Sequence, residues 1–365
     1  MQWVKLGDYI EQCDERNSSN VFSENDVKGI STTKIFIATK ANLEGVSLSS
    51  YKLVKQEEFA FVPDTSRRGD KISLSFNNLE KPCIVSSISC VFKIKNKEKL
   101  LPNYLYLWFC RQEFDRYARF NSWGSAREAF SYDDMCRIEI PLPSIEEQQK
   151  IVDIYNGLKN LKEQNLKLYQ PLMDLCQSYL QELKKKYTLV ELGGYIEQRR
   201  EKNSDFSVKK LIGVGSNGFI QPKQTKDETN GHICYIVRNN NFVFAPPQIH
   251  KGAIDYYTQN ELAKCSDAYS VFNINNNALN PHYLFIILKS KSFQQYATYY
   301  REGVREQFNY NNLCRYKIPL PPIEIQQAIV NIYNCAKNAK YISENANKLI
   351  DDICPALIRQ VIGDN

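Results

Sequence analysis

Two segments of the chain combine cationic side chains with amides, hydroxyls and aromatic rings. Residues 119–127 gather such groups around Gly124, and residues 299–305 hold a comparable set around Gly303. Lysine and arginine bind phosphates, whereas amides, hydroxyls and arginine forks read the edges of bases in a DNA groove. The chemistry that these residue types favour is therefore DNA binding.

Two further cationic groups extend this set, one in a compact turn near residue 67 and one in the second half of the chain. A structural role is the alternative for each candidate: Trp123 in a hydrophobic core, or Arg127 and Arg305 paired with neighbouring carboxylates. The candidate DNA-binding residues are Arg67, Arg68, Lys71, Arg119, Asn121, Ser122, Trp123, Ser125, Arg127, Lys223, Lys226, His250, Lys251, Tyr300, Arg301 and Arg305.

Catalytic patterns are weak by comparison. An amino-methyltransferase needs Asn or Asp before Pro-Pro and an aromatic residue, and the nearest approach, residues 245–248, lacks both the polar group and the ring. The metal-nuclease alternative is no stronger, because Asp64 has no suitably spaced acid and lysine after it. The Gly-rich residues 213–218 lack the spacing of a phosphate loop and indicate a plain turn. We expect no catalytic residues.

Metal and cofactor sites are not expected either. The chain has 3 histidines, without ligand spacing, and 11 cysteines, an odd number without close pairs. This distribution argues against both zinc binding and a disulfide framework. The formal net charge of +6 is compatible with a phosphate-binding surface but does not by itself indicate one.

An internal duplication positions the candidate residues. Residues 6–12 recur as residues 192–198, and residues 127–156 are echoed by residues 305–334. Between these similar flanks, the stretch from about Val21 to Cys90 shares almost nothing with its counterpart in the second half. One fold presented twice with different surfaces explains this pattern, and neutral drift of loops after duplication is the alternative.

Each repeat ends in a long segment with apolar residues at alternating steps of three and four, which predicts a helix with one apolar seam. Ser144 and Glu147 have capping-box spacing, and Pro171 predicts either a bend or a junction of two helices. The two helices should pack antiparallel. The candidate seam residues are Ile151, Ile154, Leu158, Leu161, Asn165 and Leu168 in the first helix, and Ile329, Ile332, Ala336, Ala339, Ile350 and Ile353 in the second.

The whole arrangement resembles the specificity subunit of type I restriction-modification systems. The matching motifs are Ile-Pro-Leu-Pro at residues 140–143 and 318–321, each followed by Gln-Gln at the start of a long helix. One departure is Ile325, where the first copy has the acidic Glu147. The resemblance implies two target recognition domains that each read half of a split target in double-stranded DNA, without catalysis. It also implies two methyltransferase (modification) subunits and motor-nuclease (restriction) subunits as partners.

The expected fold is α/β (α+β), with two similar recognition domains separated by a long antiparallel helical pair and related by pseudo-two-fold symmetry. A duplicated protein-binding scaffold and a stand-alone DNA-modifying enzyme are the alternatives. No apolar run approaches the roughly 20 residues of a membrane span, and residues 1–10 lack the basic flank and apolar stretch of a signal peptide, so we expect a cytoplasmic protein. The expected domains are 1–143 and 188–321 for recognition, with 144–187 and 322–365 as spacer helices.

Overall fold

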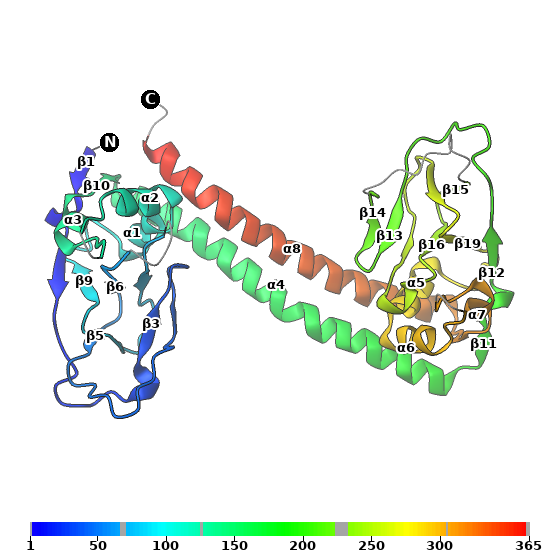
Figure 1. Cartoon of the computed structure of the whole chain (residues 1–365), viewed down its shortest axis with the longest axis horizontal. Helices are drawn as coiled ribbons and strands as arrows, with labels where there is room; N and C mark the ends of the chain where they lie inside the picture. Colours follow the sequence, from blue (N-terminus) through cyan, green and yellow to red (C-terminus); the bar gives the residue numbers. More distant parts are fainter. Residues whose placement is uncertain (1, 66–70, 125–126, 223–232, 304–305, 363–365) are drawn as a thin grey trace. The chain divides into compact units, whose positions relative to one another are not determined.

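The fold is described from a computed structural model of the chain, which forms two compact units. The structure describes residues 2–65, 71–124, 127–222, 233–303 and 306–362, with side chains up to Asp351 in the last range. The first unit contains residues 1–163 and 343–365, and the second contains residues 164–342. The predicted mixed fold, with two repeated domains and a pair of long helices, is confirmed (Figure 1).

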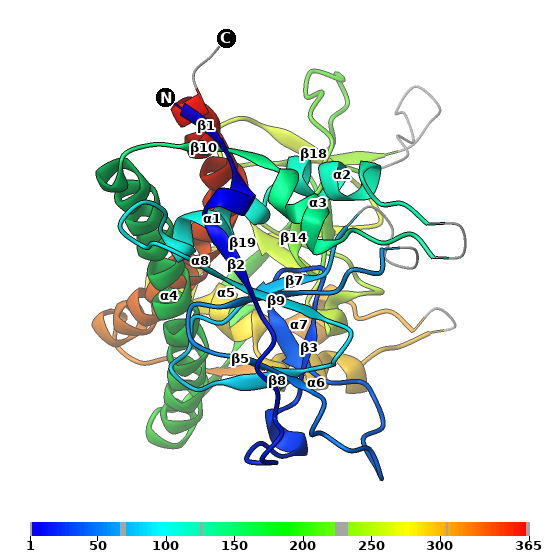
Figure 2. The ribbon, with the colours of Figure 1, turned by 90° about the vertical axis from the view of Figure 1, so that its left-hand side faces the viewer.

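The first unit is built around a four-stranded antiparallel sheet in the order β2–β9–β6–β7, with the strand pairs β1–β10, β3–β4 and β5–β8 beside it. Figures 1 and 2 show β1 and β10 at one end of this unit and β5 at the other. The strands are β1 Gln2–Lys5, β2 Ile10–Cys13, β3 Lys28–Ile30, β4 Phe36–Ala38, β5 Lys52–Val54, β6 Phe59–Phe61, β7 Leu74–Phe76, β8 Cys83–Val85, β9 Cys90–Ile94 and β10 Glu139–Leu142. The short helices are α1 Pro102–Phe109, α2 Gln112–Phe120 and α3 Tyr132–Arg137.

The second unit repeats this topology strand for strand. Its sheet has the order β12–β19–β16–β17, and the pairs are β11–β20, β13–β14 and β15–β18. The strands are β11 Leu189–Glu191, β12 Ile196–Arg199, β13 Gly213–Gly215, β14 Gly218–Ile220, β15 Cys234–Val237, β16 Phe242–Phe244, β17 Ile254–Tyr256, β18 Ala263–Ser266, β19 Ser270–Ile274 and β20 Lys317–Pro319. The short helices are α5 Pro281–Lys289, α6 Lys291–Tyr299 and α7 Tyr310–Cys314.

The two faces of each sheet carry different residues because side chains alternate along a strand. In the first unit Phe59 and Phe92 stack with ring centroids 5.0 Å apart on the face that α1 covers. The intervening Ala60 and Val91 lie in a second cluster on the opposite face. The second unit has the same division, and Phe242 again stacks on its sheet neighbour, at 4.9 Å.

The long helices are α4 Ile145–Lys186 and α8 Ile323–Ile362. The capping box at the start of α4 is present, since the Ser144 amide donates to Glu147 and the Glu147 amide donates to the Ser144 hydroxyl. A single helix continues through Pro171. None of the helices in the described ranges is both long and apolar enough to cross a membrane.

The first glutamine of each Gln-Gln motif anchors a long helix to its unit. The buried amide of Gln148 donates to the Lys99 carbonyl at 2.9 Å and the Pro143 carbonyl at 3.0 Å, and it accepts from the Leu101 amide at 2.8 Å. Gln326 makes the equivalent three bonds in the second unit. The motif is therefore a structural joint, present once per repeat.

The two helices run antiparallel within each unit. In the first unit Lys162 Nζ donates to Asn347 Oδ1 at 2.7 Å, and in the second the Lys340 ammonium lies 5.5 Å from the Tyr169 ring centroid. Within the second unit Tyr333 in turn interacts electrostatically with Cys176, so position rises along α4 as it falls along α8. On α8, Ile329, Ala336 and Ala339 are buried and Ile332 and Ile350 are half-buried, whereas the side chain of Ile353 lies outside the described residues.

The packed face of α4 differs from the expected seam. Ile151 is buried, and Leu158 and Asn165 are half-buried, but Ile154, Leu161 and Leu168 are 43%, 43% and 52% exposed. The residues that follow them, Tyr155, Lys162 and Tyr169, are half-buried in their place. The small residues of α8 leave room for these larger side chains, and a lysine can bury its methylene stem while its ammonium binds a polar group.

Candidate nucleic-acid interface

Two connections meet at one edge of the first unit, and they carry most of its predicted DNA contacts. One joins β6 to β7, and the other joins α2 to α3. The Thr65 amide donates to the Glu128 carbonyl at 3.0 Å, and the Phe130 amide donates to the Pro63 carbonyl at 2.9 Å. Backbone hydrogen bonds therefore hold together two segments that are far apart in sequence.

The side chains at this edge fall into two groups. Lys71, Arg127 and Trp123 are exposed, Trp123 at 68%, and the Trp123 backbone pairs with Ala129 through two hydrogen bonds. Arg119, half-buried, forms an ion pair with Glu128 across the α2–α3 connection. The exposed group is available to bind DNA, whereas the ion pair braces the loop.

Two predicted contacts have structural partners instead. Ser122 is buried and its hydroxyl donates to the Ala118 carbonyl at 2.6 Å, while Asn121 Nδ2 donates to the Tyr117 carbonyl at 2.9 Å. Both side chains satisfy carbonyls at the end of α2. We interpret them as helix-terminating residues, and their direct contact with bases stays a hypothesis.

The same two connections meet in the second unit. The Phe308 amide donates to the Pro246 carbonyl at 3.1 Å, and the short helix Ile249–Lys251 in the β16–β17 connection packs against α6. This helix carries His250 and Lys251, so these predicted residues occupy the strand connection in which Lys71 lies in the first unit. The structure thus brings the separately predicted groups of each unit together.

At the corresponding edge of the second unit, Arg301 forms an ion pair within its loop, as Arg119 does in the first unit. Arg301 NH1 lies 2.8 Å from a Glu306 carboxylate oxygen, and its Nε donates to the Thr298 carbonyl at 3.2 Å. His250 is half-buried, with Nδ1 unpartnered among the described groups; burial and the positive charges of Arg301 and Lys251 lower its pKa. Lys251 and Tyr300 are exposed, Tyr300 at 41%.

Six of the predicted contacts lie outside the described residues. They are Arg67, Arg68, Ser125, Lys223, Lys226 and Arg305.

The prediction left out one aromatic residue in each unit. Phe120 ends α2 and Tyr299 ends α6, and these equivalent side chains are 77% and 80% exposed. Exposed rings beside cationic loops are suited to stacking on bases or packing against sugars. Both residues lie within the segments singled out from the sequence, but only burial distinguishes them from core aromatics.

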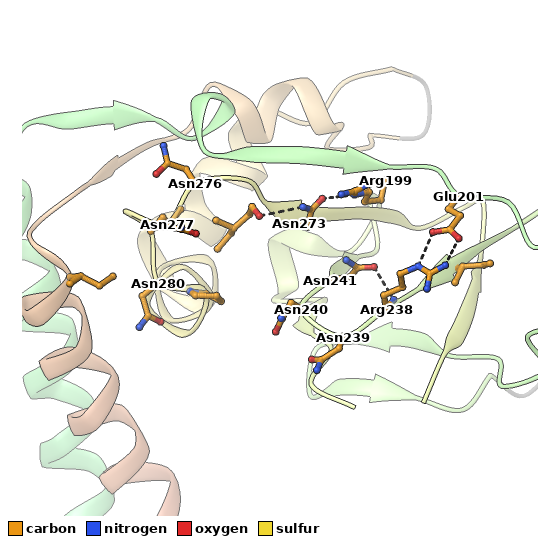
Figure 3. Close-up of a pocket in the computed structure, with 15 residues that line it drawn as sticks. Arg199, Glu201, Arg238, Asn239, Asn240, Asn241, Asn273, Asn276, Asn277 and Asn280 are labelled. Carbon is orange, nitrogen blue, oxygen red and sulfur yellow. Dashed lines mark hydrogen bonds and ion pairs between the residues drawn. The ribbon is translucent and has the colours of Figure 1, made fainter. Parts of the chain in front are cut away.

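A polar hollow of about 510 Å³ lies elsewhere in the second unit (Figure 3). Its charged groups are already paired: Arg238 binds Glu201 through Nε at 2.9 Å, and Arg199 Nε donates to Asn273 Oδ1 at 2.7 Å. The equivalent pair in the first unit, Lys55 and Glu15, is 2.5 Å apart. Because this pairing recurs, we interpret it as part of the shared architecture. Within the described ranges, no group of His, Cys, Asp or Glu residues is arranged to hold a metal.

Comparison with known proteins identifies the family of the chain. The profile described as "Type I restriction modification DNA specificity domain" matches residues 28–169 and again residues 182–348. The chain belongs to this family. No curated protein matches the chain.

One solved structure supports the fold, and a second has a lower TM-score. The S subunit of a type I restriction-modification system from M. genitalium is similar with a TM-score of 0.56 at 13% identity, over 100% of this chain and 97% of that one. The HsdS subunit from Thermoanaerobacter tengcongensis gives a TM-score of 0.48 at 17% identity, over 99% of this chain and 96% of that one. The double family match fits the strand-for-strand repetition of the two units in this specificity protein.

Proposed function

We propose that each unit of this type I specificity protein reads one half of a split DNA target through its two paired connections. The observation that supports this most strongly is the repetition: the β6–β7 and α2–α3 connections, and their counterparts in the second unit, carry the exposed cationic and aromatic groups. The exposed groups differ between the copies, with Lys71 and Trp123 in one and Lys251 and Tyr300 in the other. Two different surfaces on one fold would read two different half-targets.

The long helices have a second proposed role, as the docking surface for two methyltransferase subunits. Ile154, Leu161, Leu168 and Leu175, at seven-residue intervals on α4, are between 43% and 52% exposed. We name these four residues the α4 stripe. Exposed apolar residues aligned on one helix face are typical of surfaces that a partner helix covers. The residues at 145–186 and 323–362 would thus set the spacing of the half-targets and bind the partner.

We further propose the division of the chain into recognition domains 1–143 and 188–321 and spacer helices 144–187 and 322–365. In this account the chain contributes recognition and no catalytic group, and motor-nuclease subunits join the complex for cleavage. The methyltransferase partner would reach its base by flipping it from the duplex. The complex would act in the cytoplasm.

Methylation mapping tests the proposal. The chain would be co-expressed with its cognate type I methyltransferase subunit, in a host without other DNA methylation, and methylated bases would be mapped across the genome. We expect one motif made of two specific parts separated by a fixed number of unspecified bases. A continuous motif, or no methylation that depends on this chain, would contradict the proposal.

A further inference from the structure

Each unit contains a lysine whose ammonium is shielded from solvent near the candidate interface. Lys34, in the β3–β4 turn, is 5% exposed, and Lys289, at the end of α5, is half-buried. Each ammonium lies near a phenylalanine ring, 5.3 Å from the Phe114 centroid and 5.6 Å from the Phe285 centroid. Removing a charge from water is unfavourable unless it gains partners, so the partners show what each lysine holds together.

In the first unit Lys34 ties the β3–β4 turn to the end of the β6–β7 connection. Its Nζ donates to the Ile72 carbonyl at 2.8 Å and to Asp115 Oδ1 at 2.5 Å, and the same Asp115 oxygen accepts from the Ile72 amide at 3.1 Å. Both polar backbone groups of Ile72 are therefore held. Ile72 directly follows Lys71, an exposed candidate contact.

In the second unit Lys289 makes the equivalent link from a different element. Its Nζ donates to the Gly252 carbonyl at 2.8 Å and to the Ser216 carbonyl, in the β13–β14 turn, at 3.2 Å. Gly252 directly follows Lys251. It is also the structural counterpart of Ile72, because each precedes by two positions the first residue of an equivalent strand, β7 Leu74 or β17 Ile254.

The two links are built from unrelated positions of the duplicated sequence. Lys34 comes from the hairpin turn, whereas Lys289 comes from a helix end whose counterpart in the first unit is the exposed Cys110. In both units a lysine ammonium links equivalent groups: the carbonyl of Ile72 or Gly252 on the strand connection, and the β3–β4 or β13–β14 hairpin. A chance contact would not be expected to reach equivalent acceptors twice from different elements.

We propose that Lys34 and Lys289 are positioning residues for DNA recognition, each locking the β3–β4 or β13–β14 hairpin and the neighbouring strand connection into one reading surface. The inference rests on the proposed function and deepens it, because it adds the hairpins to the surface that reads each half-target. Loss of a link would leave the cationic residue before it free to shift, and base discrimination depends on the geometry of the contacting side chain.

The test uses the full chain co-expressed with its methyltransferase partner. In the first unit Lys34→Met would leave Asp115 charged and buried, so the variant to use is Lys34→Met with Asp115→Asn, which removes both charges and keeps an acceptor for the Ile72 amide. In the second unit Lys289→Met is sufficient, because among the described residues the hydrogen-bond acceptors of its ammonium are backbone carbonyls. Lys5→Met and Lys317→Met, at exposed lysines of β1 and β20, are the matched controls.

The readout is methylation of a plasmid library that carries the mapped target with single-base changes in either half, together with the melting temperature of each variant. We expect both variants to remain folded with a lowered melting temperature, because the Ile72, Gly252 and Ser216 carbonyls lose a donor. We also expect a loss of discrimination of about tenfold, the scale of one base contact, in one half for each lysine variant and in opposite halves for the two. The control variants should discriminate normally.

Unchanged discrimination in the two folded lysine variants, or relaxation of the same half by both, would overturn the inference while the proposed function stood. If the first-unit variant fails to fold, Lys289→Met alone decides, since relaxation of one half supports the inference and normal discrimination overturns it. Absence of a two-part motif with the unaltered chain would refute the proposed function, and the inference with it.

Discussion

Lys251 and His250 are neighbours in the β16–β17 connection but differ in charge at neutral pH. Burial and two nearby cations lower the pKa of His250 below its usual 6.5, so at pH 7.5 it is neutral while Lys251 is charged. We expect Lys251→Met to reduce the slope of log Kobs against log salt by about 0.9, the value for one phosphate contact, and His250→Asn to leave it unchanged. Fluorescence anisotropy with a labelled duplex at pH 7.5 measures both slopes.

The salt dependence of DNA binding should also change with pH, in a direction set by the protonation of His250. As pH falls through the lowered pKa, His250 gains a proton, so the salt slope of the unaltered chain should steepen whereas that of His250→Asn should not. A loss of slope in His250→Asn at pH 7.5 equal to that in Lys251→Met would contradict this assignment.

Residue types predicted which segments expose cationic and aromatic groups better than they predicted the partners of individual side chains. The segments around Trp123 and Tyr300 do carry exposed cationic and aromatic groups, because loops at sheet edges expose such residues. The hydroxyl of Ser122 makes it a candidate DNA contact, yet that hydroxyl is buried and donates to the Ala118 carbonyl. A serine at a helix end and a serine in a DNA contact have the same sequence signature, and only the backbone geometry separates them.

The Gln-Gln joints are an element-scale feature with a direct stability test. Gln148→Met would leave the Leu101 amide and the Lys99 and Pro143 carbonyls without the buried partner that they share. Since an unsatisfied buried group costs about 1–3 kcal/mol, we expect a loss of roughly 3 kcal/mol or more in the free energy of unfolding, measured by urea denaturation. Gln149→Met, at the exposed neighbour that binds Asp153, should change it by about 0.5 kcal/mol or less. Equal effects would show that Gln148 is not the joint.

The α4 stripe is the second element-scale prediction. Leu161→Glu should abolish co-purification of a methyltransferase subunit without changing the melting temperature, because Leu161 is already 43% exposed in the free chain. The control is Asn156→Glu, an exposed position about 200° around the helix from Ile154. If the Leu161→Glu variant still co-purifies with the methyltransferase subunit, the α4 stripe is not the docking surface.

The two long helices show where sequence patterns were sufficient and where they were not. The bounds of α4 follow from a capping box and three lysines, which act locally. The face that packs depends on the partner helix. An apolar pattern assigns Leu161 to the seam, but α8 presents Ala339 and Ala346, and the larger Lys162 and Tyr169 occupy that space. A pattern that counts lysine only as polar could not identify this.

At the scale of the whole molecule, the duplication separates the residues that build the fold from the residues exposed on the candidate interface. The described strands pair in the same way in both units, and each unit has one glutamine joint, so the shared sequence builds the fold. The exposed groups on the paired connections differ, so those segments would distinguish the two half-targets. The repeated fold was predictable because both copies keep the apolar residues of the core and the joint glutamine, whereas surface residues are free to diverge.

Exchange of one reading surface tests the central claim most directly. Residues 21–131, which contain the β3–β4 hairpin and both connections of the first unit, would be replaced by the equivalent segment of another specificity protein with a known split target. Methylated bases would then be mapped with the same methyltransferase partner. The account predicts a motif in which one half is new and the other half is the one read by the unaltered second unit. A change in both halves, or in neither, would contradict it.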